Sequence, residues 1–369
     1  MSTDVMIALD EVSKRFEGSG EAAVSDLSMD IGRGETVVLV GPSGCGKTTT
    51  MKMINRLIEP SGGTIVVDGR NVAEQDPVEL RRGIGYVIQS IGLLPHRTIQ
   101  ENIATVPRLE GWDAGRTQAR VDDLMSIFEL DRSMLQRYPS ELSGGQRQRV
   151  GVARALAADP PVMLMDEPFG AVDPIVRERL QDQFLAIQER LRKTIVFVTH
   201  DIDEAIKMAD RIAILNLGGV IEQYAPPEQI LREPASDFVK QFVGAERGLK
   251  RLALIEVSDI EVEDGPVVAP STSAEEARRT MEKFDLDWTA VVDDGELLGW
   301  IDADSVEGKA RVGDAAPRKF SAYVTARSTL RQALDSIVTS RTQVAVVVDK
   351  EERYRGILTL ERVSSEIIS

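Results

Sequence analysis

The stretch GPSGCGKT, residues 41–48, decides the fold of this 369-residue chain. It follows an apolar segment, ETVVLV (35–40), and leads into KTTTMKMINRLI (47–58), whose apolar residues have helical spacing. Glycines at these positions let the backbone wrap phosphate groups with its N–H groups pointing inward, which side chains would obstruct. Strand, glycine-rich loop and helix in this order predict the opening of a nucleotide-binding α/β domain.

The loop residues have separate predicted roles. Lys47 is expected to reach the outer phosphates, and the Thr48 hydroxyl to ligate Mg²⁺. The helix N-terminus adds the positive end of its dipole. Cys45 occupies a free position of the motif and is interpreted as a tolerated small residue rather than a redox switch. The predicted nucleotide-binding residues here are Gly41, Pro42, Ser43, Gly44, Cys45, Gly46, Lys47, Thr48 and Thr49.

Polar residues end three further apolar segments. In PVMLMDE (161–167), Asp166 is predicted to hold the Mg²⁺ shell and Glu167 to orient a water at the γ-phosphate. His200, at the end of TIVFVTH, is a candidate donor to the γ-phosphate; the alternative is a capping or packing residue. Gln89, after GYVI, is a contact of Mg²⁺ and water or simply a polar strand end. Strands alternating with helices predict a mostly parallel sheet with ligands at its carboxyl edge.

A second glycine turn precedes another helix in LSGGQRQR, residues 142–149. Ser143, Gly144 and Gly145 offer a hydroxyl and backbone N–H groups at that helix start, which predicts a second anion site. The region from about residue 92 to 158 is largely helical, with a capping box in TIQE (98–101), so a helical insert separates the two glycine turns. Two such helix starts in one domain suggest that one nucleotide is clamped from both sides.

Composition excludes several other classes of protein. The net charge of −16 would repel nucleic acid, so a DNA- or RNA-binding role is not expected. No apolar run approaches the roughly 18 residues of a membrane span, and the start, MSTDVMIALD, is acidic where a signal peptide would be basic. One cysteine excludes an internal disulfide framework, and two histidines argue against a zinc centre.

The last third of the chain contains a weak repeat with an offset of 56 or 57 residues. Each copy has the pattern of a helix, a buried strand, a turn and a second strand. The alternative is two unrelated fragments. The matching positions are Ala277 with Ala333, residues 291–293 with 347–349, and Gly299 with Gly356.

LSGGQ, the glycine-rich loop, the Asp166–Glu167 pair and His200 together resemble the ATP-binding cassette (ABC) ATPases, over about residues 6–245. The resemblance implies that two cassettes meet head to tail, so that Ser143, Gly144, Gly145 and Gln146 of one copy face the ATP of the other. It also implies that Phe16 stacks on adenine and that Gln89 links the γ-phosphate to the transport partner. Asp173 is expected at the dimer seam, and His200 to sense the γ-phosphate.

Residues 85–107, 197–212 and 237–252 resemble the ATPase subunits for uptake of glycine betaine, proline, carnitine or choline. That family carries a tail of two cystathionine-β-synthase-type (CBS) domains, which the repeat resembles. The expected fold is α/β: a P-loop NTPase ABC cassette with a RecA-like core sheet, an N-terminal antiparallel β part and a helical subdomain, followed by a smaller α+β tandem CBS module. The expected domains are the cassette (1–245), a linker (246–251) and two CBS domains (252–308 and 309–369).

The resemblance implies an ATPase that uses ATP and Mg²⁺ to energise osmoprotectant import, with regulation by the CBS tail. The implied partners are a second copy of the chain, separate transmembrane permease subunits and, indirectly, an extracytoplasmic solute-binding protein, with no nucleic acid. The chain is then expected at the cytoplasmic face of the inner or plasma membrane, peripheral through the permease. Alternatives are an importer ATPase for another small solute, such as an amino acid, or a cytosolic ATP-gated sensor.

The tail departs from the nucleotide-binding form of CBS domains, in which a Ser or Thr and, three residues later, an Asp hold the ligand. The first copy has Asp302 and Ser305 at these two places, which does not favour adenosine binding; the second has Thr359 and Arg362, which leaves it open. Charge is also uneven, with a net −12 over residues 251–308 and +4 over 309–369. Either these charges form an electrostatic latch that weakens with salt, or they simply keep the surface soluble.

Overall fold

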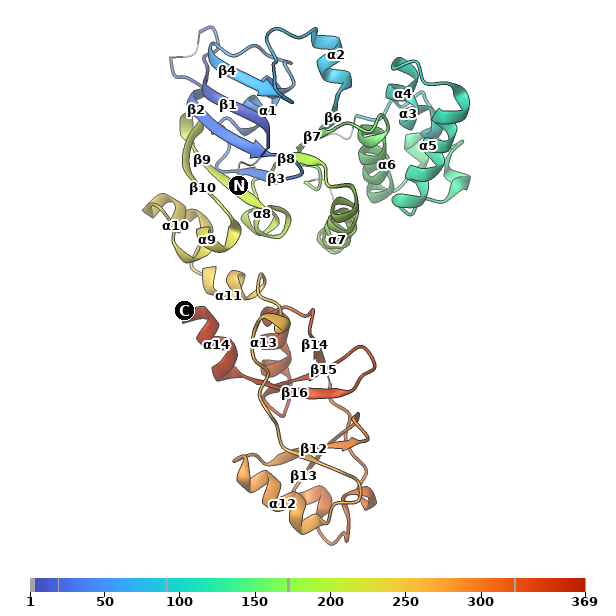
Figure 1. The fold of residues 1–369 in the computed structure, drawn as a ribbon, viewed down its shortest axis with the longest axis vertical. Helices are drawn as coiled ribbons and strands as arrows, with labels where there is room; N and C mark the ends of the chain where they lie inside the picture. Colours follow the sequence, from blue (N-terminus) through green and yellow to red (C-terminus); the bar gives the residue numbers. More distant parts are fainter. Residues whose placement is uncertain (1–3, 19, 90–91, 171–172, 322, 369) are drawn as a thin grey trace. The chain divides into compact units, whose positions relative to one another are not determined.

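The glycine-rich loop follows a central strand of a six-stranded sheet (Figure 1). The strands are β3 (Thr36–Val40), β6 (Ile84–Val87), β7 (Val162–Asp166), β8 (Thr194–Val198), β9 (Arg211–Asn216) and β10 (Val220–Ala225). Their order is β10-β9-β3-β8-β7-β6, and all neighbours run parallel except the edge strand β10. The predicted mostly parallel sheet is confirmed, with the polar residues that end or follow β6, β7 and β8 at one edge.

The computed structural model describes residues 4–18, 20–89, 92–170, 173–321 and 323–368. The chain divides into two units, Met1–Val243 and Gly244–Ser369, each described below by itself. No helix in the described ranges is both long and apolar enough to cross a membrane.

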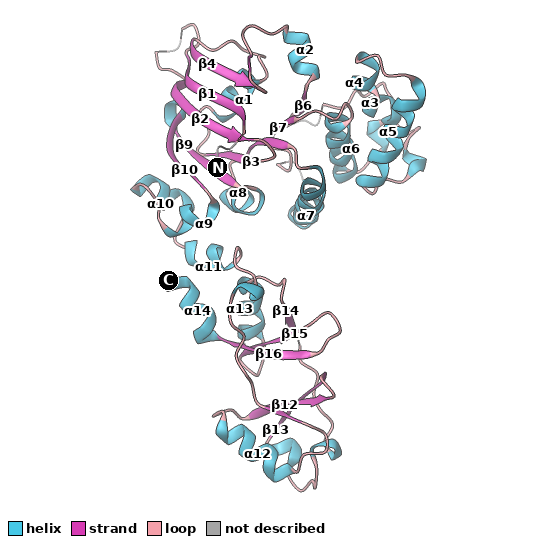
Figure 2. Cartoon of the chain, in the orientation of Figure 1, coloured by secondary structure: helices cyan, strands magenta, loops and turns pink. Residues whose placement is uncertain are grey.

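The first unit also holds a four-stranded sheet in the order β2-β1-β4-β5. Figure 2 shows β2, β1 and β4 side by side. The strands of this sheet are β1 (Val5–Lys14), β2 (Val24–Gly32), β4 (Gly62–Val67) and β5 (Arg70–Asn71), all paired antiparallel. This sheet shares one core with alternate residues of the six-stranded sheet, such as Val37 and Leu39 of β3. All five positions of β3 are buried, as expected for a parallel strand covered on both faces.

Helices complete the first unit. They are α1 (Lys47–Ile54), α2 (Pro77–Arg82), α3 (Ile99–Ile103), α4 (Thr105–Leu109), α5 (Ala114–Ile127), α6 (Gly144–Leu156), α7 (Pro174–Leu191), α8 (Ile202–Met208), α9 (Pro227–Arg232) and α10 (Asp237–Val243). The predicted capping box at the start of α3 is present, with Thr98 and Glu101 bonding reciprocally. Figure 1 shows α3, α4, α5 and α6 grouped together, away from β1, β2 and β4. This group confirms the predicted helical region.

The second unit contains two three-stranded sheets with the same topology, β11-β12-β13 and β14-β15-β16. Its elements are α11 (Arg247–Leu252), β11 (Val267–Val268), α12 (Ala274–Lys283), β12 (Trp288–Asp293), β13 (Glu296–Asp302), β14 (Tyr323–Thr325), α13 (Leu330–Thr339), β15 (Val344–Val348), β16 (Tyr354–Thr359) and α14 (Leu360–Ile368). Helix, strand, turn and strand recur in each copy, as the repeat predicts. The additional parallel strands β11 and β14 were not predicted, because two or three residues carry no periodic signal.

The two copies exchange their N-terminal segments. Leu252 and Val257 lie in the core of the second copy, whereas Val312 and Ala315 lie in the core of the first. Helix α11, which covers most of the segment expected to be a linker, packs against α13 and α14. A boundary at residue 309 therefore separates the two copies of the sequence repeat. It does not separate the two hydrophobic cores, because each core contains residues from both sides of it.

Candidate functional site

The loop between β3 and α1 requires glycine for steric reasons. Gly41, Gly44 and Gly46 have φ of 154°, 81° and 100°, values that disfavour other residues. A Cβ at residue 41 would lie 2.1 Å from the carbonyl oxygen of Leu215, and one at residue 46 would lie 2.6 Å from that of Ala23. The glycines of the sequence pattern are therefore required by the backbone conformation of the loop. At Gly41 and Gly46 the backbone of another segment lies so close that no side chain fits.

Lys47 opens α1 and lies across this loop. Its ammonium donates to the carbonyl oxygens of Gly41 at 2.7 Å and Pro42 at 3.0 Å, and the side chain is buried. Cys45 is also buried, beside Lys47, which fits a packing role. The remaining loop positions are accessible to a ligand: Ser43 and Gly44 are exposed, and Pro42, Thr48 and Thr49 are half-buried.

Two of the three predicted Mg²⁺ contacts, Thr48 and Asp166, touch each other, whereas the third, Gln89, bonds to Glu167. The Thr48 hydroxyl donates to the Asp166 carboxylate at 3.0 Å. Burial raises the pKa of Asp166, and the neighbouring Glu167 raises it further, while the bond from Thr48 lowers it. Hydroxyl and carboxylate oxygens are the hard ligands that Mg²⁺ accepts, usually with substrate phosphates completing its shell. The pair therefore fits a Mg²⁺ ion, whose charge would also relieve the repulsion between the two acids.

The three predicted catalytic side chains converge from the ends of three neighbouring strands. Glu167 follows β7, Gln89 follows β6 and His200 follows β8. The Glu167 carboxylate accepts a bond from Gln89 Nε2 at 2.9 Å, and its other oxygen lies 3.1 Å from His200 Nδ1. Glu167 has φ of 44°, a costly conformation for a non-glycine residue, and its N–H donates to the Val198 carbonyl. The three side chains therefore meet at the Glu167 carboxylate.

The residues that support His200 were not predicted from the sequence. Asp201 caps α8, accepting bonds from the backbone N–H groups of Asp203 and Glu204. Glu204 is itself buried and accepts from Gln181 of α7 at 3.0 Å, and burial raises its pKa. Acidic residues in a first helical turn are ordinarily exposed, so the pattern DIDEA alone could not identify this contact. The network fixes the turn that carries His200.

The second predicted anion site lies at the start of α6. Ser143 caps the helix and forms a capping box with Gln146. A hollow of about 570 Å³ opens in front of it, lined in part by Ser143, Gly144, Gly145 and Asp173. Because the lining of this hollow includes no residue of 41–48, the hollow and the phosphate loop are separate surfaces.

Phe16 lies just beyond β1 and is 45% exposed, which is high for a phenylalanine. The ammonium of Lys14 lies 5.2 Å from the centroid of its ring. An exposed ring of this kind can stack on a base. This is consistent with the predicted adenine contact.

In the first CBS copy, internal partners occupy the predicted ligand position. Asp302 is 7% exposed and accepts bonds from Ser305, from Arg318 at 2.8 Å and from Arg341, of the second copy, at 3.0 Å. These contacts, with the Ser305 hydroxyl contributing most, lower the pKa of Asp302 to about 2. Asp302 therefore joins the two copies rather than presenting a free carboxylate to a ribose.

The second copy is similarly occupied. The Thr359 hydroxyl donates to Glu263 at 2.7 Å, and accepts from the Arg362 N–H. The Arg362 guanidinium pairs with Glu366 at 3.0 Å. Adenosine binding here would have to break the bond between Thr359 and Glu263.

Asp302→Asn is expected to lower the free energy of unfolding of this unit by about 2 kcal/mol at pH 7. Because the folded pKa is depressed, this stabilisation is present above the unfolded pKa of 3.8 and is lost as the pH falls towards about 2. Urea unfolding followed by tryptophan fluorescence, at pH 7 and at lower pH, measures it. Asp294→Asn, in an exposed turn, is the matched control; an equal loss in both variants would contradict the account.

Sequence comparisons identify relatives of the whole chain. The ABC transporter family profile matches residues 24–170, and the CBS domain profile matches residues 257–306 and 312–369. The osmoprotectant import ATP-binding protein OsmV of Salmonella typhimurium is 46% identical, over 99% of this chain and 97% of that protein. The glycine betaine/carnitine/choline transport ATP-binding protein OpuCA of Bacillus subtilis is 47% identical, over 96% of this chain and 94% of that protein.

Solved structures match the first unit. The dimeric structure of a bacterial ABC transporter cassette superposes with a TM-score of 0.55 and 33% identity, covering 60% of this chain and 99% of that chain. A dimeric, post-hydrolysis ATP-binding cassette bound to ADP and Pi gives a TM-score of 0.55 with 32% identity, at the same coverage.

Proposed function

We propose that this chain, which belongs to the ABC transporter family of ATP-binding subunits, hydrolyses ATP to drive import of a quaternary-amine osmoprotectant. The observation that carries the ATPase assignment is the convergence of Gln89 and His200 on Glu167. The solute class rests on the near full-length similarity to osmoprotectant and glycine betaine/carnitine/choline transport subunits. Glycine betaine, proline, carnitine and choline are the proposed solutes.

In this mechanism each side chain has a defined task. The loop N–H groups and Lys47 hold the phosphates. Thr48 and Asp166, with Gln89, would hold Mg²⁺, which would supply positive charge against the phosphates. Glu167 accepts a proton from the attacking water, and Gln89 fixes the orientation of that carboxylate. His200, placed beside Glu167, donates a hydrogen bond to the γ-phosphate. Phe16 stacks on the adenine ring.

The ATP site is completed by a second copy of the chain. Ser143 and the N–H groups of the two glycines after it form an anion site at the start of α6, yet the hollow they line contains no residue of the phosphate loop. A head-to-tail dimer would bring this surface of one copy onto the ATP of the other. Asp173, which lines the same hollow, would then lie at the dimer seam. The dimeric cassette structures support this arrangement.

The remaining partners follow from the transport role. Separate permease subunits would hold the chain at the cytoplasmic face of the membrane, and an extracytoplasmic solute-binding protein would deliver the solute. The CBS tail is proposed to regulate uptake. The pairing of Asp302 with Arg341 across the two copies, and of Thr359 with Glu263, favours regulation through ionic contacts over adenosine binding.

The test is uptake into vesicles that contain this chain, its permease and the solute-binding protein. The expected result is ATP-driven uptake of labelled glycine betaine or choline, above the uptake of a panel of amino acids. Uptake of an amino acid alone would replace the osmoprotectant assignment with the alternative solute. ATPase activity that is unaffected by the permease would favour the ATP-gated sensor. Salt activation that survives deletion of residues 252–369 would exclude the tail as its origin.

A further inference from the structure

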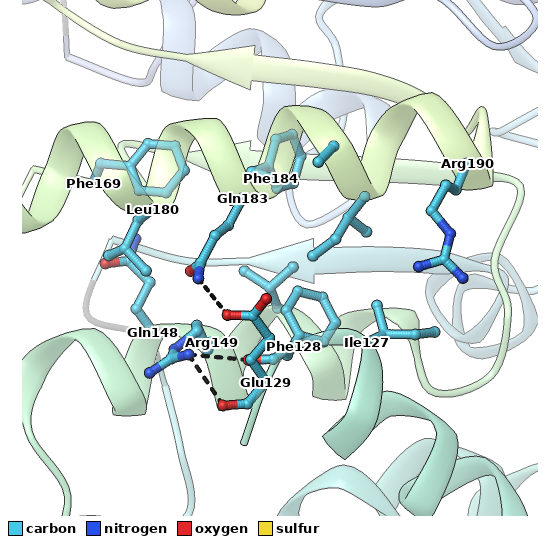
Figure 3. Close-up of a pocket in the computed structure, with 13 residues that line it drawn as sticks. Ile127, Phe128, Glu129, Gln148, Arg149, Phe169, Leu180, Gln183, Phe184 and Arg190 are labelled. Atoms are coloured by element: carbon cyan, nitrogen blue, oxygen red, sulfur yellow. Dashed lines mark hydrogen bonds between the residues drawn. The ribbon is translucent and has the colours of Figure 1, made fainter. Parts of the chain in front are cut away.

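A cavity of about 170 Å³ lies between α6, α7 and the C-terminal end of α5 (Figure 3). Eight of its 13 lining residues are apolar. Three of these are phenylalanines, Phe128, Phe169 and Phe184, and the rings of Phe169 and Phe184 meet edge to face at 6.3 Å. A cavity of roughly 150 Å³ with an apolar lining can hold a benzene ring. Its size and lining therefore suit one aromatic ring.

One buried polar side chain in the lining has no partner. Gln148 of α6 is 2% exposed, and neither its amide nitrogen nor its amide oxygen bonds to any residue in the described part of the chain. Leaving such a group unpaired in a buried site is costly, so its position calls for a ligand atom that both donates and accepts. A hydroxyl group meets this requirement.

A cation lies at the other end of the lining. Figure 3 shows Arg190 of α7 at the opposite end from Gln148, with Phe128 and Phe184 between them. Across the described ranges, no carboxylate pairs with Arg190. The acid in the lining, Glu129, accepts a bond from Gln183 at 2.8 Å, while Arg149 donates to the carbonyl oxygens of Phe128 and Glu129. Arg190 is thus available to an anionic ligand.

We propose that this cavity binds a small aromatic carboxylate with a hydroxyl group at the far end of the ring. The ring lies among the phenylalanines, the hydroxyl exchanges hydrogen bonds with the Gln148 amide, and the carboxylate pairs with Arg190. α6 begins just after Ser143 and α7 just after Asp173, so an occupant contacts both helices that carry the proposed dimer surface. The site is distinct from the nucleotide loop, so the first unit would bind a second small molecule besides the nucleotide.

The probe is 4-hydroxyphenylacetate, titrated onto the full chain with ligand-observed NMR in the presence of saturating ADP and Mg²⁺. We expect saturable binding with a Kd in the low millimolar range or tighter, as the atom count of the probe allows. Gln148→Leu should weaken it about tenfold, because the hydroxyl loses both buried partners. Arg190→Gln should weaken it about threefold, since that pair is exposed. The neutral 4-hydroxyphenylacetamide should bind the parent chain as weakly as the acid binds Arg190→Gln.

Arg192→Gln, which removes a neighbouring exposed cation outside the lining, should leave the Kd unchanged. The Gln148 variant is buried, so its thermal unfolding is measured first; if it is misfolded, the exposed Arg190→Gln carries the test. The proposal is overturned by an absence of saturable binding in the presence of ADP, by binding that occurs only when ADP is left out, or by equal affinity in the Arg190 and Arg192 variants.

Discussion

Glu167→Gln is expected to abolish ATP turnover while ATP binding is retained. The amide keeps the shape of the side chain and its contacts with Gln89 and His200, but it cannot accept the proton of the attacking water. Loss of a general base lowers a rate by about 100-fold or more. Phosphate release and equilibrium binding of a fluorescent ATP analogue, measured on the same preparation, separate the two effects.

Glu189→Gln is the matched control, because Glu189 is an exposed glutamate on α7. It should hydrolyse ATP at the rate of the parent chain. If Glu167→Gln hydrolyses ATP at that rate as well, Glu167 does not activate the water, and the proton acceptor must be sought elsewhere in the site.

Gly46→Ala should remove both nucleotide binding and much of the stability of the first unit. The new methyl group would lie 2.6 Å from the Ala23 carbonyl oxygen and 2.9 Å from a methyl carbon of Val24, in a backbone with φ of 100°. Overpacking of this kind costs about 1–3 kcal/mol, and the left-handed backbone about 1–2 kcal/mol more. The measurements are urea unfolding and ATP binding.

Gly44→Ala separates these two causes. Gly44 also has a positive φ, 81°, but a Cβ there has no atom within 4 Å. This variant should therefore lose only the backbone contribution of about 1–2 kcal/mol. Equal destabilisation in the two variants would show that steric contact with the strand β2 is not what fixes the loop.

The sequence predicts the fold class, the family and the placement of the cassette residues well, because the relevant signals are local. A buried strand ends at Asp166, a second ends before His200, and parallel pairing brings both ends to one edge. Contact between Thr48 and Asp166, 118 residues apart, follows from the same geometry. The roles assigned to these side chains in catalysis remain predictions.

Other features depend on contacts that no local pattern encodes. The exchange of N-terminal segments between the CBS copies places Val257 with the second core, although the repeat assigns it to the first. The pairing of Asp302 with Arg341 crosses between copies. The unpaired amide of Gln148 follows LSGGQ by two residues, and the sequence gives no reason to separate it from the other polar residues of that helix.

The central claim is that each ATP site is shared between two copies of the chain. The most direct test is to find which copy contacts the γ-phosphate on the side opposite the phosphate loop. A tagged Lys47→Ala chain, which should not bind ATP, is mixed with a Glu167→Gln chain that does, and a photoreactive γ-phosphate analogue of ATP is activated. The account predicts labelling of residues 142–149 on the tagged chain. Labelling confined to the chain that binds the nucleotide would contradict an ATP site shared between two copies.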